Sequence, residues 1–130
     1  MEAFDLDDTL AAVDFAEAPV RSLETVYRQA KVLYQPDVAF IVITARPNGS
    51  AGVRTATADW LKANQPNWTG AIYYCRGNDE QGIIEEKARL IKAHRVTDFT
   101  DNNENILAGL KPLVPGVVLW LIEDGVRTRF

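Results

Sequence analysis

The sequence predicts an α/β fold of three layers, a Rossmann-like arrangement in which a five-stranded parallel sheet lies between helices on both faces. Two observations predict this class. Apolar segments alternate with helical patterns along the chain, which is the signature of parallel strands joined by helices. Several apolar segments are also continuous runs of β-branched and aromatic residues, as strands buried on both faces require.

Five segments are predicted to be strands. The first, residues 1–6, leads directly into an acidic run, and the second, residues 37–44, contains the uninterrupted apolar run Phe40-Ile41-Val42-Ile43. The others are expected at residues 70–75, 96–100 and 116–122. In an open sheet of this kind the ligand crevice lies beyond the carboxyl ends of the strands, so the residues that follow each strand are the ones to inspect.

Four segments are predicted to be helices, at residues 20–34, 53–63, 83–94 and 103–110. The first carries apolar residues at the i, i+3, i+4 spacing of an amphipathic helix, and Pro36 is expected to stop it. The second repeats the pattern with Ala56, Trp60 and Leu61. Lys111-Pro112 and Pro115-Gly116 are expected to separate the last helix from the last strand.

Composition indicates a single domain over residues 1–130. Of the 130 residues 47% are hydrophobic, so the chain can bury a core of its own. No apolar run approaches the roughly 20 residues that span a bilayer, and acidic residues stand where a signal peptide would have basic ones, so we expect a cytoplasmic protein with no membrane segment. The lone cysteine, Cys75, lies in an apolar run and is expected to be a strand residue. The net charge of -4 argues against a protein that coats nucleic acid nonspecifically, although it allows a local basic pocket.

Three carboxylates follow the first predicted strand, in the run Asp5-Leu6-Asp7-Asp8-Thr9. Crowded negative charge at a strand end is costly unless a cation compensates it, because neighbouring carboxylates raise each other's pKa. A short cluster of oxygen ligands suits magnesium, which takes one or two carboxylates together with a substrate phosphate. The alternative is a helix N-cap followed by the acidic residues of a first helical turn, a purely structural arrangement.

Polar residues also follow the second predicted strand, which ends in Ile43-Thr44-Ala45-Arg46-Pro47. The Thr44 hydroxyl could donate to a phosphoryl oxygen, and the Arg46 guanidinium could grip a phosphate with two hydrogen bonds. The structural alternative is that Thr44 caps the turn that follows it. The tip of this strand is expected to face the tip of the first, which favours the functional interpretation.

Lys87 and Asp101 complete the candidate site. Lys87 has Ile83, Ile84, Leu90 and Ile91 three and four positions away, so it projects from the apolar face of a helix, where an ammonium group needs a specific partner. The alternatives are a solvated surface lysine and the later Lys92; Lys87 is preferred because the helix N-terminus points to the crevice side. Asp101 follows the fourth predicted strand, and capping of the next helix is its structural alternative.

These features resemble, along essentially the whole chain, the signatures of the haloacid dehalogenase superfamily: Asp5-Leu6-Asp7-Asp8-Thr9, Thr44, Lys87 and Asp101. The resemblance implies a phosphatase, in which Asp5 attacks phosphorus to form an aspartyl phosphate and Asp7 protonates the leaving oxygen and then activates water. It also implies that Thr44 and Lys87 hold the phosphoryl oxygens. Mg²⁺ would be bound by Asp5, the backbone carbonyl of Asp7, and Asp101. Asn102 and Asn105 stand where many members carry a further Asp, which points to weaker or more selective metal binding.

The connections 10–37 and 47–87 are too short for the cap insertions usual in this superfamily, so we expect a HAD-like fold with minimal or no cap and an open crevice. Loose matches at Thr44-Ala45-Arg46-Pro47, at residues 54–61 and at Tyr74-Cys75-Arg76 look like the phosphatase domain of polynucleotide kinase-phosphatases. On that resemblance the substrate site would include Thr44, Ala45, Arg46, Arg76 and Lys87. A protein partner or a second copy of the chain could cover the open site.

Three functions stay open on the sequence. The leading one is a magnesium-dependent phosphomonoesterase that acts on a nucleotide or polynucleotide end, such as a 3′-phosphate. The second is a phosphatase of a small sugar or nucleoside monophosphate, favoured by the net acidity and by the absence of a clustered basic stripe. The third is a catalytically inert HAD-fold binding module. The presence of Asp5, Asp7, Thr44 and Lys87 argues against this third function.

Overall fold

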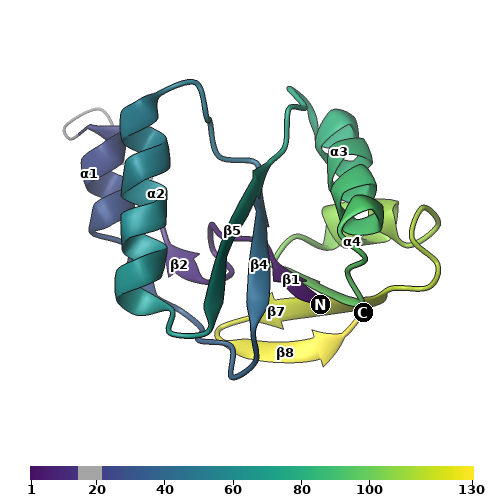
Figure 1. The fold of residues 1–130 in the computed structure, drawn as a ribbon. Coiled ribbons are helices and arrows are strands. Elements are labelled where there is room, and N and C mark those ends of the chain that lie inside the picture. Colours follow the sequence, from purple (N-terminus) through teal and green to yellow (C-terminus); the bar gives the residue numbers. More distant parts are fainter. Residues whose placement is uncertain (15–21) are drawn as a thin grey trace.

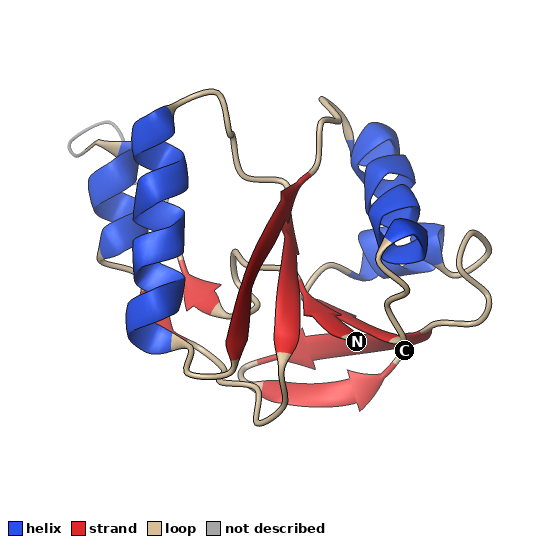
Figure 2. Cartoon of the chain, viewed as in Figure 1, coloured by secondary structure: helices blue, strands red, loops and turns tan. Residues whose placement is uncertain are grey.

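The computed structural model describes residues 1–14 and 22–130 and has a mostly parallel sheet of six strands with helices on both faces (Figure 1, Figure 2). The strand order is β5 (Trp68–Tyr74), β4 (Phe40–Thr44), β1 (Glu2–Phe4), β6 (Asp98–Asp101), β7 (Val118–Glu123) and β8 (Val126–Arg129). The first five strands are parallel, and β8 is antiparallel to β7. The α/β class predicted from the sequence is therefore confirmed.

Strand β1 lies at the centre of the sheet, between β4 and β6. Phe4 pairs with Val42 on one side and with Thr100 on the other. From β1 the chain adds β4 and β5 outward in one direction, then returns to add β6 and β7 in the other. In such sheets the crevice forms where this direction reverses, beyond the carboxyl ends of the strands. The residues after β1 and at the end of β6 therefore share one edge.

Two helices cover each face of the sheet (Figure 1). Helices α1 (Leu23–Arg28) and α2 (Ala51–Asn64) lie on one side, where Trp60 and Leu61 pack with Phe4 and Phe40. Helices α3 (Glu80–Ala93) and α4 (Glu104–Leu110) lie on the other, in a core cluster that contains Phe99. These pairs of helices form the walls on either side of the crevice edge.

The helices begin at side-chain caps that the sequence supplies. Ser50 accepts from the backbone N–H of Val53, Asp79 from that of Gly82 at 2.7 Å, and Asn103 from that of Ile106 at 3.2 Å. Helices α2, α3 and α4 overlap the predicted segments 53–63, 83–94 and 103–110 and differ from them only at their ends. The caps account for these starts, because each satisfies an otherwise unpaired N–H of the first turn.

The prediction of a helix over residues 20–34 was wrong in its length. Helix α1 covers only Leu23–Arg28, and Lys31–Val32 form β3, which pairs antiparallel with β2 (Ala11–Ala12); Val20, with which the prediction began, lies outside the described residues. The Leu33 N–H donates to the Leu10 carbonyl at 2.8 Å, which extends this ribbon. Backbone pairing between distant segments thus overrides the local helical spacing, and Leu33 is left 40% exposed.

The prediction of five strands was also wrong, because β8 adds a sixth and makes the sheet mixed. A two-residue turn, Asp124-Gly125, joins β7 to β8, with Glu123 paired to Val126. Both turn residues have positive φ, 51° and 76°, as the tight hairpin turn that matches strand twist requires. Within the described residues, no helix has the length and apolar character needed to cross a membrane.

Candidate active site

A cavity of about 380 Å³ opens at the carboxyl edge of the sheet, between α1 on one side and α3 and α4 on the other. The predicted residues Asp5, Asp7, Lys87 and Asp101 line it. The remaining lining comes from both walls and from the turn after β4: Leu23, Tyr27, Ala45, Arg46, Pro47, Ile83, Asn102, Asn103 and Ile106. Segments far apart in the sequence therefore contribute to one hollow.

A tight turn after β1 lets Asp5 and Asp7 contact different cations. The Asp5 N–H still donates to the Thr100 carbonyl at 2.9 Å, so the ladder with β6 continues to this residue. The Leu6 carbonyl then accepts from the N–H groups of Leu10 and Ala11, and Asp8 takes a φ of 60°, which reverses the chain. Asp5 pairs with Lys87, whereas Asp7 pairs with a different cation.

Lys87 places a buried ammonium group between two carboxylates. Its Nζ lies 3.1 Å from Asp5 Oδ1 and 2.8 Å from Asp101 Oδ2, and its side chain is 3% exposed. Burial lowers the pKa of Lys87, but the charges of Asp101 and Asp5 outweigh burial and raise it above its ordinary value. Lys87 is therefore charged and holds the ends of β1 and β6 together from helix α3.

Asp101 is the most deeply buried of these acids, with a side chain 1% exposed. Its Oδ1 accepts from the Asn103 N–H at 3.1 Å, but the N-cap of α4 is Asn103, so the structural alternative that Asp101 caps this helix was wrong. Burial first, and then the charge of Asp5, raise the pKa of Asp101 to about 6, although Lys87 opposes the shift. Negative charge at this edge is thus only partly compensated by the chain's own ammonium group.

Asp7 pairs with Arg46 rather than with Lys87. Arg46 Nε and Nη2 both donate to Asp7 Oδ1, at 2.9 and 2.7 Å. Arg46 Nη1 donates to Thr57 Oγ1 at 3.1 Å, and the guanidinium carbon lies 3.7 Å from the centre of the Tyr27 ring. Burial raises the pKa of Asp7, and the hydrogen bonds and charge of Arg46 act against that rise.

Thr44 and Arg76 lie apart from this group. The Thr44 hydroxyl oxygen accepts from the Arg46 N–H at 3.1 Å, which is the turn-capping arrangement that the sequence left open, and Thr44 is not among the residues that line the cavity. Arg76 follows β5, is exposed, and is also absent from the lining. Ala45 lines the cavity beside Arg46.

Sequence reasoning gave no role to three residues that hold the site together. Thr9 Oγ1 donates to Asp5 Oδ2 at 3.2 Å, and Thr57 and Tyr27 hold Arg46. A usable signal existed for Thr57, a hydroxyl on the apolar face of α2 beside Val53 and Ala56. This signal is weaker than the one for Lys87, because a helical threonine can donate its hydroxyl to the carbonyl four residues earlier, as Thr57 does to Val53 at 2.8 Å.

Three groups at this edge could hold a magnesium ion through oxygen atoms: the Asp5 carboxylate, the Asp7 backbone carbonyl and the Asp101 carboxylate. The side-chain amide of Asn102 satisfies its neighbours when its nitrogen faces the Asp7 carbonyl and Asp101. In that orientation it donates to the Asp7 carbonyl oxygen at 3.3 Å and to Asp101 Oδ1 at 3.2 Å. These two oxygens are therefore close enough to share one partner. The Asp5 carboxylate, which shares Lys87 with Asp101, is a third oxygen group at this edge, and oxygen ligands are the hard type that Mg²⁺ prefers. Among residues 1–14 and 22–130, no three His, Cys, Asp or Glu side chains cluster so as to hold a metal, so the set depends on the Asp7 backbone carbonyl.

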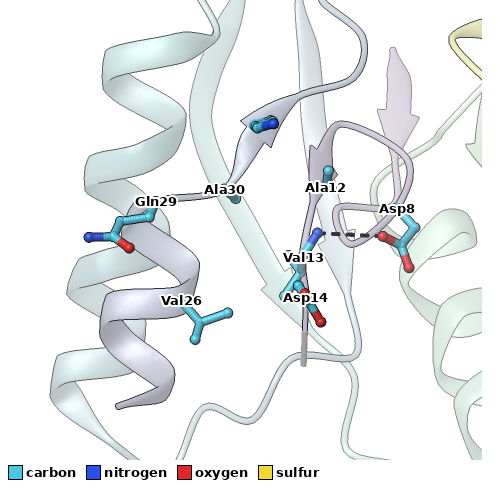
Figure 3. Close-up of a pocket in the computed structure, with 8 residues that line it drawn as sticks. Asp8, Ala12, Val13, Asp14, Val26, Gln29 and Ala30 are labelled. Carbon is cyan, nitrogen blue, oxygen red and sulfur yellow. Dashed lines mark hydrogen bonds between the residues drawn. The ribbon is translucent and has the colours of Figure 1, made fainter. Parts of the chain in front are cut away.

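Two other features lie close to the site. A larger hollow of about 550 Å³ is bounded by Asp8, Val13 and Asp14 on one side and by Val26 of α1 on the other, together with Gln29 and Ala30, which follow that helix (Figure 3). It contains none of the predicted catalytic side chains, so the smaller cavity is the candidate site. Cys75 is buried immediately after β5, and its burial raises the pKa of the thiol to about 11.

The chain was compared with protein-family models, with curated proteins and with solved structures, and none of the three comparisons found a match.

Proposed function

We propose that the chain is a magnesium-dependent phosphomonoesterase with a Rossmann-like, HAD-like fold that works through an aspartyl phosphate. The observation that carries the proposal is the buried contact of Lys87 with both Asp5 and Asp101 at the edge of the cavity. The strand order β5-β4-β1-β6-β7, which reverses at the strand before Asp5, supports the fold assignment. The sequence resemblance to the haloacid dehalogenase superfamily supplies the reaction class.

In the first step Asp5 is the nucleophile. Lys87 and Thr9 each donate to one of its oxygens, which fixes the carboxylate in the cavity while leaving lone pairs for attack. An Asp5 oxygen bonds to phosphorus, the bond from phosphorus to the leaving oxygen breaks, and Asp7 gives that oxygen its proton. Burial favours protonated Asp7, because it raises the pKa of this carboxyl group.

In the second step Asp7 acts as a base. It takes a proton from water as the water oxygen bonds to phosphorus and the bond from phosphorus to Asp5 breaks, which releases inorganic phosphate and restores both carboxyl groups. Asp7 is suited to both steps because it lines the cavity and stays partly exposed, with 22% of its side chain accessible.

Asp5, the Asp7 carbonyl and Asp101 would hold Mg²⁺, which when bound neutralises phosphate charge and lets one anion approach another. Lys87 offsets part of the charge of Asp5 and Asp101. Asn102 keeps the Asp7 carbonyl and Asp101 near each other. The chain therefore supplies both the oxygen ligands and the ammonium group that such a site needs.

For the substrate we propose a nucleotide or polynucleotide end, on the resemblance to polynucleotide phosphatases. One observation favours the alternative of a small sugar or nucleoside monophosphate. Among the described residues, the cations that line the cavity are Arg46 and Lys87, and both already pair with carboxylates of the chain. A polymer end would have to be held mainly by exposed cations such as Arg76 at the rim.

Phosphate release from a panel of phosphomonoesters with Mg²⁺ tests the proposal. The panel contains 3′- and 5′-phosphorylated oligonucleotides, mononucleotides and sugar phosphates, and it is run on the wild type and on Asp5→Asn. We expect turnover by the wild type and none by Asp5→Asn, with the circular dichroism spectrum unchanged. Turnover that survives the substitution removes Asp5 as the nucleophile, and no release from any substrate favours the inert binding module. Activity that falls steeply with salt identifies a nucleic-acid substrate.

A further inference from the structure

We propose that Arg46 is a positioning residue that holds Asp7 in place for proton transfer and does not bind the phosphoryl group of the substrate. The inference rests on the proposed phosphatase function and replaces the role that sequence resemblance suggested for this arginine. The evidence for it is that the Arg46 guanidinium contacts Asp7, Thr57 and Tyr27 within the chain.

Each nitrogen of the Arg46 guanidinium already donates to the chain. Nε and Nη2 donate to Asp7 Oδ1, and Nη1 donates to Thr57 Oγ1. One face of the guanidinium lies on the Tyr27 ring, and none of the side chain is exposed. A phosphoryl group that took over the Nε and Nη2 hydrogen bonds would break the pair with Asp7 and leave a buried charge without its partner.

The two hydrogen bonds to Asp7 are asymmetric. Both end on Oδ1, so negative charge is stabilised on that oxygen and Oδ2 is left to hold and to transfer the proton. Asp7 lines the cavity and keeps 22% of its side chain exposed, whereas Arg46 is fully buried. The Asp7 carboxyl group therefore borders the cavity beside the guanidinium, and its Oδ2 takes no hydrogen bond from Arg46.

Two helices keep the guanidinium in this orientation. Thr57 is completely buried on α2, where its hydroxyl also donates to the Val53 carbonyl at 2.8 Å and so presents a lone pair to Arg46. Tyr27 is 1% exposed on α1 and supports the planar face. The guanidinium is planar and always charged, and it is held at its edge by Thr57 and on its face by Tyr27, so it can fix the orientation of the Asp7 carboxylate. Lysine could not reproduce this geometry.

The leaving group distinguishes positioning from phosphate binding. Phenyl phosphate needs a proton on its leaving oxygen, whereas p-nitrophenyl phosphate releases a stable anion at neutral pH and depends far less on an acid. If Arg46 positions Asp7, Arg46→Gln lowers kcat/KM for phenyl phosphate, which reports the first step alone, by about 100-fold or more, the usual contribution of a general acid. The kcat/KM for p-nitrophenyl phosphate falls much less, because its leaving group hardly needs the acid.

Two further measurements separate this role from a structural one. Thr57→Val keeps the charge of Arg46 but removes the acceptor of Nη1, so it should lower kcat/KM for phenyl phosphate selectively and by a smaller factor. The Kd for inorganic phosphate, measured by calorimetry with Mg²⁺ present, should be the same for the wild type and for Arg46→Gln. Circular dichroism verifies that both variants are folded.

The outcomes separate the two proposals. An equal loss on the two substrates, together with a raised KM and a weaker Kd for phosphate, would overturn the positioning role and make Arg46 a phosphate ligand. A wild-type protein that releases phosphate from neither substrate would overturn the phosphatase itself, and the inference would fall with it. The selective loss on phenyl phosphate supports both.

Discussion

Lys87 Nζ lies 3.1 Å from Asp5 Oδ1, although 82 positions separate the two residues in the sequence. The same nitrogen also contacts Asp101, so one ammonium group links a helix to two adjacent parallel strands. Because all three groups are buried, the contact bears on stability as well as on chemistry.

Lys87→Met should destabilise the fold strongly. The substitution leaves Asp5 and Asp101 buried without their cation, and breaking a buried ion pair in this way typically costs about 3–5 kcal/mol. Urea denaturation followed by circular dichroism measures the loss. Lys92→Met on the exposed side of the same helix is the matched control and should change stability by less than about 0.5 kcal/mol. Similar small effects of both substitutions would contradict the role assigned to Lys87.

Magnesium should stabilise the protein more at pH 7.5 than at pH 5. Burial and the charge of Asp5 raise the pKa of Asp101 to about 6, so a proton occupies this carboxyl below that pH and competes with the metal. The gain in Tm on adding Mg²⁺ should therefore shrink as pH falls through about 6. Asp101→Asn should lose most of the gain at both pH values, whereas the exposed Asp124→Asn should keep it. A gain that does not depend on pH would argue against Asp101 as a ligand.

Cys75 should resist alkylation in the native protein. Burial raises the pKa of its thiol to about 11, so little thiolate forms at pH 8, and the side chain is also shielded. Mass spectrometry after treatment with iodoacetamide should find the native chain largely unmodified and the urea-unfolded chain fully modified. Rapid modification of the folded chain would mean that the thiol is accessible and activated.

Gly77→Ala should destabilise the loop that leads into α3. A Cβ at this position would lie 2.4 Å from the backbone carbon of Gly82 and 2.4 Å from the nitrogen of Ile83, and backbone atoms cannot move aside cheaply. We expect a loss of about 1–3 kcal/mol, measured by thermal unfolding. Gly116→Ala is the control, because a Cβ there meets nothing within 4 Å. An unchanged Tm for Gly77→Ala would show that the loop relaxes freely.

The part of the fold that rests on long apolar patterns could be predicted from the sequence. The run Phe40–Ile43 forms the buried strand expected of it, and Lys87 was recognisable because a charge on an apolar helical face needs a partner. Strand β8 was missed because Arg127, Thr128 and Arg129 form no apolar run, although Asp124-Gly125 is a strong hairpin signal.

The partner of Arg46 could not be predicted in the same way. The sequence indicates that an arginine stands at the tip of a strand, but both phosphate and a carboxylate satisfy a guanidinium. Which of them it meets depends on the turn at Asp8, whose positive φ turns the chain between Asp7 and the β2 strand. Such a turn is set by tertiary contacts, as is the end of α1 at Arg28.

The central position of β1 has a consequence for how the protein acquires its chemistry. Its three residues pair on one side with β4 and on the other with β6, where Glu2 meets Asp98 across most of the sequence. The entropy of closing both long loops opposes these pairings until the core on each face forms. Asp5 and Asp101 therefore contact Lys87 together only in the fully assembled sheet. A partly folded chain has the acidic run Asp5–Asp8 without the ammonium group of Lys87 beside it. The proposed active site is therefore complete only when the whole sheet has folded.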